Sequence, residues 1–164
     1  MVTGVRETSR ILAQTSFGEP QLVAALAGAR AGEVERLRWE HVDLVRGWVL
    51  LPGTKTAKSR RRVPLAHDLA EALRRVKRAA GLVVTKWMNV RRDLAKACLR
   101  AKIPIATPND LRRTFASWLK QAGNDSMVVA KLLGHSTTRM VELVYGHLST
   151  NEYQSAISDL PLLR

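Results

Sequence analysis

The sequence is dominated by short segments in which apolar residues recur at helical spacing, most of them closed by a glycine. Glycine readily adopts the left-handed backbone conformation that ends many helices, so these glycines mark helix boundaries. A chain built this way buries its apolar stripes by packing helices against one another. The pattern predicts helices over Glu19–Gly28, His67–Ala80, Thr85–Ala101, Thr107–Gly123, Asn124 or Asp125 to Gly134, and Thr150–Leu160.

Residues 47–65 break the helical pattern. Trp48–Leu51 predicts a strand, Pro52 and Gly53 a turn, and Arg61–Leu65 a second strand. We therefore expect a mainly α (α+β) fold, with residues 1–164 forming a single helical domain that carries a small antiparallel β-hairpin. The loop and the start of the second strand hold five cations and no acid, namely Lys55, Lys58, Arg60, Arg61 and Arg62. Such a tip can enter a DNA groove or lie along its phosphates.

The charge balance points to a polyanionic partner. The chain has 27 Lys and Arg against 14 Asp and Glu, a formal net charge of +13 and a pI of about 11.0. On charge alone, a ribosomal or histone-like protein held by phosphate contacts is an equal alternative to an enzyme. The hydrophobic content of 46% is sufficient for a packed core and argues against a disordered basic tail.

Cysteine and hydropathy limit the class further. Cys98 is the only cysteine, so no internal disulfide can form, and it is most simply a core residue in a reducing compartment. With one cysteine and scattered histidines, no metal site is expected. No apolar run approaches the roughly 20 residues of a membrane span, and the first residues lack the apolar block of a signal peptide. We therefore expect a soluble, cytoplasmic protein without a membrane partner.

Five short motifs occur in a fixed order along the chain. Together they resemble the boxes of the catalytic domain of the tyrosine recombinases, or phage-type integrases, and the resemblance spans about residues 20 to 150. The motifs are Ala27–Glu33, Lys55 in a hairpin followed by Arg62–Leu65, Asn109–Ala116, Leu132–Ser136 and finally Tyr145.

The resemblance implies a DNA strand transferase that needs neither a metal nor a high-energy cofactor. Tyr145 would attack a scissile phosphodiester, giving a 3′-phosphotyrosyl link and a free 5′-hydroxyl. Lys55 would protonate the departing 5′-oxygen as a general acid. Because the phosphotyrosyl link keeps the bond energy, another 5′-hydroxyl can reverse the step. A phenol has a pKa of about 10, so Tyr145 requires a polarised phosphate and cationic neighbours.

The remaining boxes would bind and polarise the phosphate. Arg30 and Arg112 would clamp its non-bridging oxygens, because guanidinium forks match phosphate geometry and neutralise charge in the transition state. His135 would hydrogen-bond a phosphate oxygen, and Glu33 would hold the turn that carries Arg30. An Arg-x-x-Glu pair by itself is more often a surface ion pair. Further DNA contacts are expected from cations in and beside these boxes: Lys58, Arg60, Arg61, Arg62 and Arg113.

The sequence departs from the family pattern in several places. Asn109 stands where the family usually has histidine, and an asparagine cannot shuttle a proton. We expect it to slow catalysis without abolishing it. The spacing of ten residues from His135 to Tyr145 is one residue longer than expected for the family, which predicts a shifted or locally bulged helix at Tyr145. Ala27 stands where the family usually has threonine, which is a minor change. The separate N-terminal DNA-binding domain of the family is expected to be absent. The chain would then be a shortened form of a longer recombinase, a natural fragment or an unusually short member of the family.

Two functional classes remain open on the sequence. The first is a bacterial or phage-derived site-specific recombinase that acts on double-stranded DNA. Its segment Thr150–Leu160 would join protomers into a homo-oligomer, a tetramer on DNA, with a monomer possible in isolation. The second is a catalytically weak or silent DNA-binding relative. A tyrosine-type topoisomerase uses related chemistry, but the boxes resemble those of integrases. Tyr153 is expected to be a core or docking residue.

Overall fold

The computed structural model describes residues 19–53, 60–76, 78–84, 89–100, 102 and 104–145, and every structural statement below concerns these residues. The predicted Thr150–Leu160 helix and Tyr153 lie outside them, as do Lys55 and Lys58 of the predicted hairpin tip. Of Tyr145 the structure describes the backbone alone.

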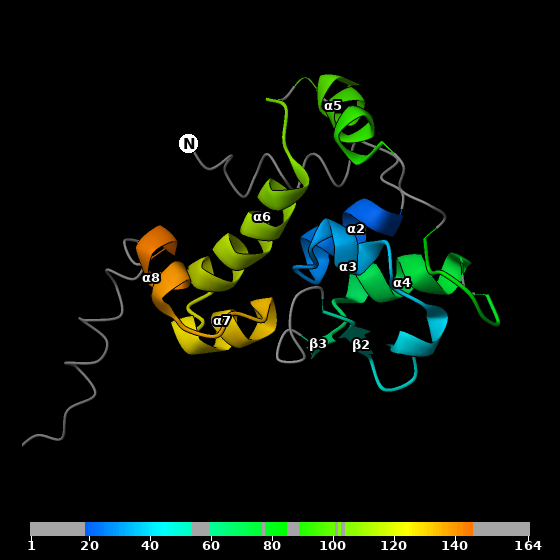
Figure 1. Cartoon of the computed structure of the whole chain (residues 1–164), viewed down its shortest axis with the longest axis horizontal. Helices are drawn as coiled ribbons and strands as arrows, with labels where there is room; N and C mark the ends of the chain where they lie inside the picture. Colours follow the sequence, from blue (N-terminus) through cyan, green and yellow to red (C-terminus); the bar gives the residue numbers. More distant parts are fainter. Residues whose placement is uncertain are drawn as a thin grey trace, which may run out of the picture.

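Helices make up most of the described chain, which confirms the expected fold class. Helix α6 runs through the middle of the molecule, with α7 and α8 packed at one end and α2 along its side (Figure 1). Helix α2 also packs against α3 and α4. The helices are α2 (Glu19–Leu26), α3 (Ala31–Val34), α4 (His67–Val76), α5 (Val90–Arg100), α6 (Pro108–Gln121), α7 (Ser126–Leu133) and α8 (Arg139–Tyr145).

A small antiparallel sheet completes the fold. Its order is β1 (Val42–Asp43), β2 (Trp48–Leu51) and β3 (Arg61–Pro64), with Val49 opposite Val63. The predicted hairpin is therefore present, but the sheet has a third strand that the sequence did not indicate. A two-residue strand is too short to show an alternating pattern. Strand β3 also contacts α7, which brings the sheet to the helix that precedes His135.

Helix boundaries follow the local signals closely around α6 and α7. The Thr107 hydroxyl accepts a hydrogen bond from the Asp110 backbone N–H, and the Asp110 carboxylate accepts one from the Thr107 N–H at 2.8 Å, which is a capping box. Asp125 caps α7, and Gly134 ends that helix with φ 67°. These caps fix where the side chains just beyond the helices emerge.

Helix α4 ends four residues earlier than predicted. Its last residue is Val76, whereas the apolar pattern suggested Ala80. The backbone of residues 81–83 pairs instead with residues 37–39: Trp39 donates to the Gly81 carbonyl at 3.0 Å and Val83 donates to the Leu37 carbonyl at 2.8 Å. This long-range pairing competes with the final helical turn. Helix α5 begins at Val90, and residues 85–88 of its predicted start lie outside the described chain.

The core is one continuous apolar cluster between α2, the sheet and the other helices. Helix α2 is buried on nearly all sides, since Val23, Ala24 and Ala25 are completely inaccessible. Such a helix forms a rigid centre from which the following turn projects. Other fully buried members of the cluster are Ala27, Ala29, Val34, Leu37, Leu51, Leu69, Leu73, Leu94, Cys98, Val129 and Val141.

Candidate active site

The turn between α2 and α3 presents Arg30. Arg30 is the N-cap residue of α3, with extended backbone, and its N–H donates to Oε2 of Glu33 at 2.8 Å. Its guanidinium also donates to Oε1 of Glu33 at 3.1 Å. The Glu33 side chain is inaccessible, while the Arg30 side chain is 37% exposed. The pair is therefore no ordinary surface ion pair: a buried carboxylate anchors the turn, and the arginine head reaches outward.

Gly28 allows this turn to lie directly against α6. Its φ of 60° lies in the left-handed region, and a Cβ at this position would lie 2.6 Å from a ring carbon of Phe115. Any side chain would strain the backbone and push the turn away from α6. Close packing of this turn against α6 brings the Gly28 carbonyl within reach of Arg112, which α6 carries.

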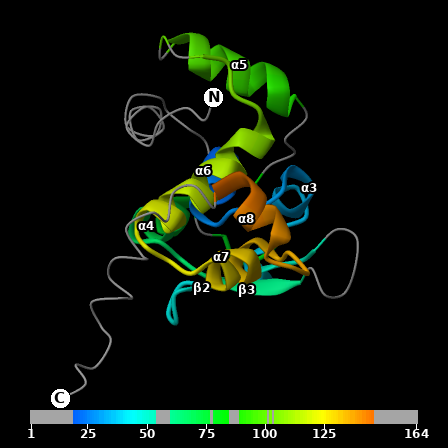
Figure 2. The same ribbon diagram turned by 90° about the vertical axis from the view of Figure 1, so that its left-hand side faces the viewer.

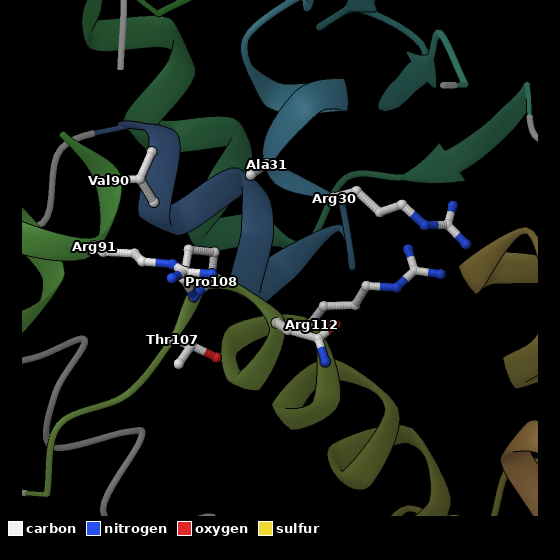
Figure 3. Close-up of a pocket in the computed structure, with 8 residues that line it drawn as sticks. Arg30, Ala31, Val90, Arg91, Thr107, Pro108 and Arg112 are labelled. Carbon is white, nitrogen blue, oxygen red and sulfur yellow. The ribbon is translucent and has the colours of Figure 1, made fainter. Parts of the chain in front are cut away.

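Arg112 is a buried arginine that connects the turn to the end of α7. Its side chain donates to the carbonyl oxygens of Gly28 and Leu133, and its Nη2 lies 3.1 Å from Nε2 of His135. The residue is only 6% exposed. In Figure 3 the side chains of Arg30 and Arg112 extend in the same direction and their guanidinium groups converge. Two arginines on separate elements thus form one cationic centre.

His135 follows the left-handed Gly134 at the end of α7. Its backbone N–H donates to the Ala130 carbonyl at 2.9 Å, so the ring is held beside Arg112. Burial, followed by the nearby charges of Arg112, Arg30 and Arg61, lowers the pKa of His135 from 6.5 to about 4. The imidazole is therefore neutral near neutral pH. Its Nδ1 is buried and has no hydrogen-bond partner among the described residues.

The structure corrects the grouping of Arg61 with DNA-facing cations. Its side chain is 7% exposed and forms a two-point ion pair with Glu33, at 2.9 Å to Oε1 and 3.1 Å to Oε2. It also donates to the carbonyls of Leu132 at 2.6 Å and Gly28 at 3.2 Å. These contacts and the Arg30 pair keep the pKa of Glu33 below its usual value, although burial alone would raise it.

The alternation of residues along β3 indicates that the Arg61 side chain points into the protein. Side chains alternate between the two faces of a strand, so Arg61 shares a face with Val63, which is buried. Arg62 and Pro64 are exposed on the other face. Reading β3 by its alternation would therefore have placed Arg61 inside and Arg62 outside.

A cavity of about 370 Å³ adjoins the two convergent arginines. Asn109 is among its lining residues and is exposed, so the structure brings this amide to the same cavity as Arg30 and Arg112. Arg91 extends from α5 toward Pro108 at the other side of the cavity (Figure 3). The cavity is thus bounded by cations contributed by the α2–α3 turn, α5 and α6.

Other predicted DNA contacts lie on the surface or outside the described chain. Arg60 and Arg62 are exposed, and Arg113 is exposed with an ion pair to Asp110 at 3.6 Å. Nothing is described of the predicted general acid Lys55 or of Lys58. The described geometry therefore brings together Arg30, Glu33, Asn109, Arg112 and His135.

Helix α8, which carries the predicted nucleophile, packs against α6 and α7 (Figure 2). Val141 anchors it and is completely buried. The helix is α-helical at every residue from Arg139 to Tyr145, so the bulge suggested by the spacing from His135 is not found in it. Residues 136–138 form a bend before the helix starts.

The described residues contain no group of histidine, cysteine, aspartate and glutamate side chains that could hold a metal ion. Cys98 is buried with a free thiol, in agreement with its expected place in the core. No helix in the described ranges combines the length and apolar character needed to cross a membrane.

Comparison with known proteins identifies the family. The sequence model of the phage integrase family matches residues 21–152. The tyrosine recombinase XerC of Chlorobaculum tepidum is 30% identical over 151 residues, covering 79% of this chain and 44% of the relative. The chain spans less than half the length of the curated relatives that it matches, XerC among them.

Solved structures agree on the fold. The catalytic domain of bacteriophage HP1 integrase superimposes with a TM-score of 0.76 at 25% identity, covering 98% of this chain and 95% of that domain. The Tn1549 transposon integrase in complex with transposon right end DNA gives a TM-score of 0.77 at 17% identity, over 96% of this chain and 65% of the solved integrase chain. The chain therefore belongs to the phage integrase family and has the fold of a tyrosine recombinase catalytic domain.

Proposed function

We propose that this chain is the catalytic domain of a site-specific DNA recombinase or integrase. The observation that carries the proposal is the convergence of Arg30, Arg112 and His135 from three different elements onto one cationic centre. A phosphodiester in this centre would face two guanidinium groups, which suit its paired non-bridging oxygens. The related Tn1549 integrase has been solved bound to DNA, and the net charge of +13 favours the same class of partner.

In the proposed reaction the phenol of Tyr145 loses its proton to solvent water, and its oxygen attacks the scissile phosphorus. The bond from phosphorus to the 5′-oxygen breaks, a 3′-phosphotyrosyl link forms, and Lys55 gives a proton to the departing 5′-oxygen. Arg30 and Arg112 neutralise the charge that builds on the non-bridging oxygens. Rejoining is the reverse step with a 5′-hydroxyl as nucleophile, so the cycle consumes no ATP.

His135 and Asn109 have secondary roles in this scheme. In the structure His135 is neutral near neutral pH, and its Nε2 faces Arg112. A phosphate placed between them adds negative charge, which raises the pKa of His135 and favours an Nε2–H that donates to a phosphate oxygen. Asn109 lines the adjoining cavity and can donate a hydrogen bond, but it cannot accept the phenol proton of Tyr145. We therefore expect slow but measurable cleavage.

Covalent trapping tests the proposal directly. The chain is incubated with nicked suicide duplexes, from which the strand beyond the cleavage site diffuses away, and DNA–protein adducts are counted after denaturation. We expect an adduct in the parent and in Tyr153→Phe, and none in Tyr145→Phe. Salt-sensitive DNA binding without any adduct would support the alternative, a silent DNA-binding relative.

The finer assignments follow once an adduct is found. Exchange of strands between two duplexes would establish a recombinase, whereas relaxation of supercoils without exchange would indicate a topoisomerase. The proposed assembly is a homo-oligomer, a tetramer on DNA, formed through the C-terminal segment in the cytoplasm of a bacterium or a phage-infected cell. Light scattering of the protein with and without a duplex site measures this assembly, and a monomer under both conditions would contradict it.

A further inference from the structure

Arg61 is buried beside the candidate active site and contacts the Gly28 turn, Glu33 of α3 and the end of α7. We propose that Arg61 is a positioning residue: it holds Arg30 and the His135-bearing turn in register through Glu33 and two backbone carbonyls, without touching DNA itself. This inference rests on the proposed function for its catalytic consequence, but its structural claim can be measured separately.

The first link runs from Arg61 through Glu33 to Arg30. The two terminal nitrogens of Arg61 each donate to one carboxylate oxygen of Glu33, at 2.9 and 3.1 Å. The same two oxygens accept from Arg30, Oε2 from its backbone N–H at 2.8 Å and Oε1 from its guanidinium at 3.1 Å. Glu33 therefore accepts hydrogen bonds from two arginines. The buried Arg61 fixes the plane of the carboxylate, and this plane sets how the carboxylate binds Arg30.

The second link runs to the other half of the centre. Nε of Arg61 donates at 2.6 Å to the carbonyl of Leu132, near the end of α7, and Nη2 donates at 3.2 Å to the carbonyl of Gly28. That Gly28 carbonyl is also an acceptor for Arg112. A single guanidinium thus spans the turn that carries Arg30 and the helix end that leads to His135.

The Arg61 side chain packs closely against Gly134, the residue that ends α7. A Cβ at Gly134 would lie 3.0 Å from both Cδ and Nη1 of Arg61. The side chain of Arg61 therefore packs under the left-handed turn that precedes His135, and a Cβ at Gly134 would press against it. Because Arg61 is 7% exposed and Glu33 is inaccessible, water cannot replace these contacts cheaply.

Lysine cannot reproduce this arrangement. A guanidinium is a planar fork that donates along several fixed directions, whereas an ammonium is a compact point charge. Arg61→Lys keeps the positive charge while losing the simultaneous contacts to Glu33, Gly28 and Leu132. The substitution therefore separates positioning from simple charge compensation.

The test compares Arg61→Lys and the double variant Glu33→Gln/Arg61→Met with the parent chain. The double variant removes both charges together, so it leaves no unpaired buried charge and guards against a trivial failure to fold. Arg46→Lys is the matched control, since Arg46 is 83% exposed and pairs with Asp43 at the surface. The side-chain Nε–H signal of Arg30, assigned by its loss in Arg30→Lys, is followed by ¹⁵N relaxation in the whole chain.

We expect the Arg30 signal to be ordered in the parent and in Arg46→Lys, and mobile in both Arg61 variants. At saturating suicide duplex, the single-turnover rate of adduct formation should fall about 10- to 100-fold in those variants, the loss typical of a small misplacement of a catalytic group. The dissociation constant for DNA should change less than about threefold, because a residue that does not touch DNA contributes little to binding.

Three results would overturn the inference. One is an Arg30 signal that stays ordered in both Arg61 variants. Another is a rate of adduct formation that is the same in these variants as in the parent, when the parent is active. The third is a loss confined to DNA affinity, which would make Arg61 a direct DNA contact. If the parent forms no Tyr145-dependent adduct but Arg30 becomes mobile without Arg61, the proposed function fails while the positioning role stands.

Discussion

Acidification should destabilise the folded chain through His135. Its pKa is lowered from 6.5 to about 4 in the folded state, so the unfolded chain binds more protons between these values. Stability therefore rises with pH across this window: the contribution of His135 is complete above about pH 6.5 and is lost as the pH falls toward about 4. The physical cause is burial of the ring, followed by the positive charges of Arg112, Arg30 and Arg61.

The size of the effect follows from the two pKa values. A shift from 6.5 to about 4 corresponds to at most about 3–4 kcal/mol once the pH lies below both values. Between about pH 7.5 and about pH 5.0, proton linkage gives a loss of about 2 kcal/mol in the free energy of unfolding. Such a loss is a substantial part of the stability of a domain of ordinary size.

Urea unfolding at these two pH values measures the loss. His135→Asn removes the titrating group, so the difference between the two pH values should shrink by about 2 kcal/mol in that variant. His67→Asn, at an exposed histidine, is the matched control and should retain the parent's difference. The imidazole signal of His135 should titrate with a midpoint near 4. A midpoint near 6.5, or an equal pH dependence in parent and His135→Asn, would refute the reasoning.

Three further outcomes are expected. Gly28→Ala should lower the free energy of unfolding by about 2–4 kcal/mol, because a left-handed φ is combined with a Cβ 2.6 Å from Phe115. Gly47→Ala has a similar φ of 72° but open space, so urea titration should show a loss of only about 1–2 kcal/mol, and equal losses would refute the steric argument. Asn109→His should raise the single-turnover cleavage rate by supplying a proton acceptor, and an unchanged or lower rate would contradict this role. Arg62→Gln should reduce the slope of log affinity for DNA against log salt by about 0.9, whereas an unchanged slope would show that Arg62 makes no phosphate contact.

Local sequence signals predicted the elements that lead into the site. Thr107 and Asp110 form the expected capping box of α6, and Gly134 ends α7 in the left-handed conformation. Both signals act within about one helical turn, so the residues that create them are neighbours in sequence. Strand β2 has the predicted bounds, Trp48–Leu51, because its signal also lies within a few neighbouring residues.

Three of the misjudged features depend on partners that are distant in sequence. Helix α4 stops at Val76 because residues 81–83 pair with residues 37–39. Strand β1 forms because Val42 and Asp43 pair with β2. Two residues are too few to show the alternating pattern that would predict this pairing. Arg61 looked like one more cation in a basic run, since its charge is visible in sequence and its burial is not.

The sequence by itself determined the family motifs, the helical architecture, the positive charge and the types of side chain available for phosphate chemistry. These properties depend on residue identity and on neighbours a few positions apart. Only the tertiary structure decided which arginines face outward. Arg61 meets Glu33 across 28 positions and Leu132 across 71, and Arg112 meets Gly28 across 84. A guanidinium either binds DNA or holds the fold according to the acceptors that packing places around it, and those acceptors are assembled only when the chain folds.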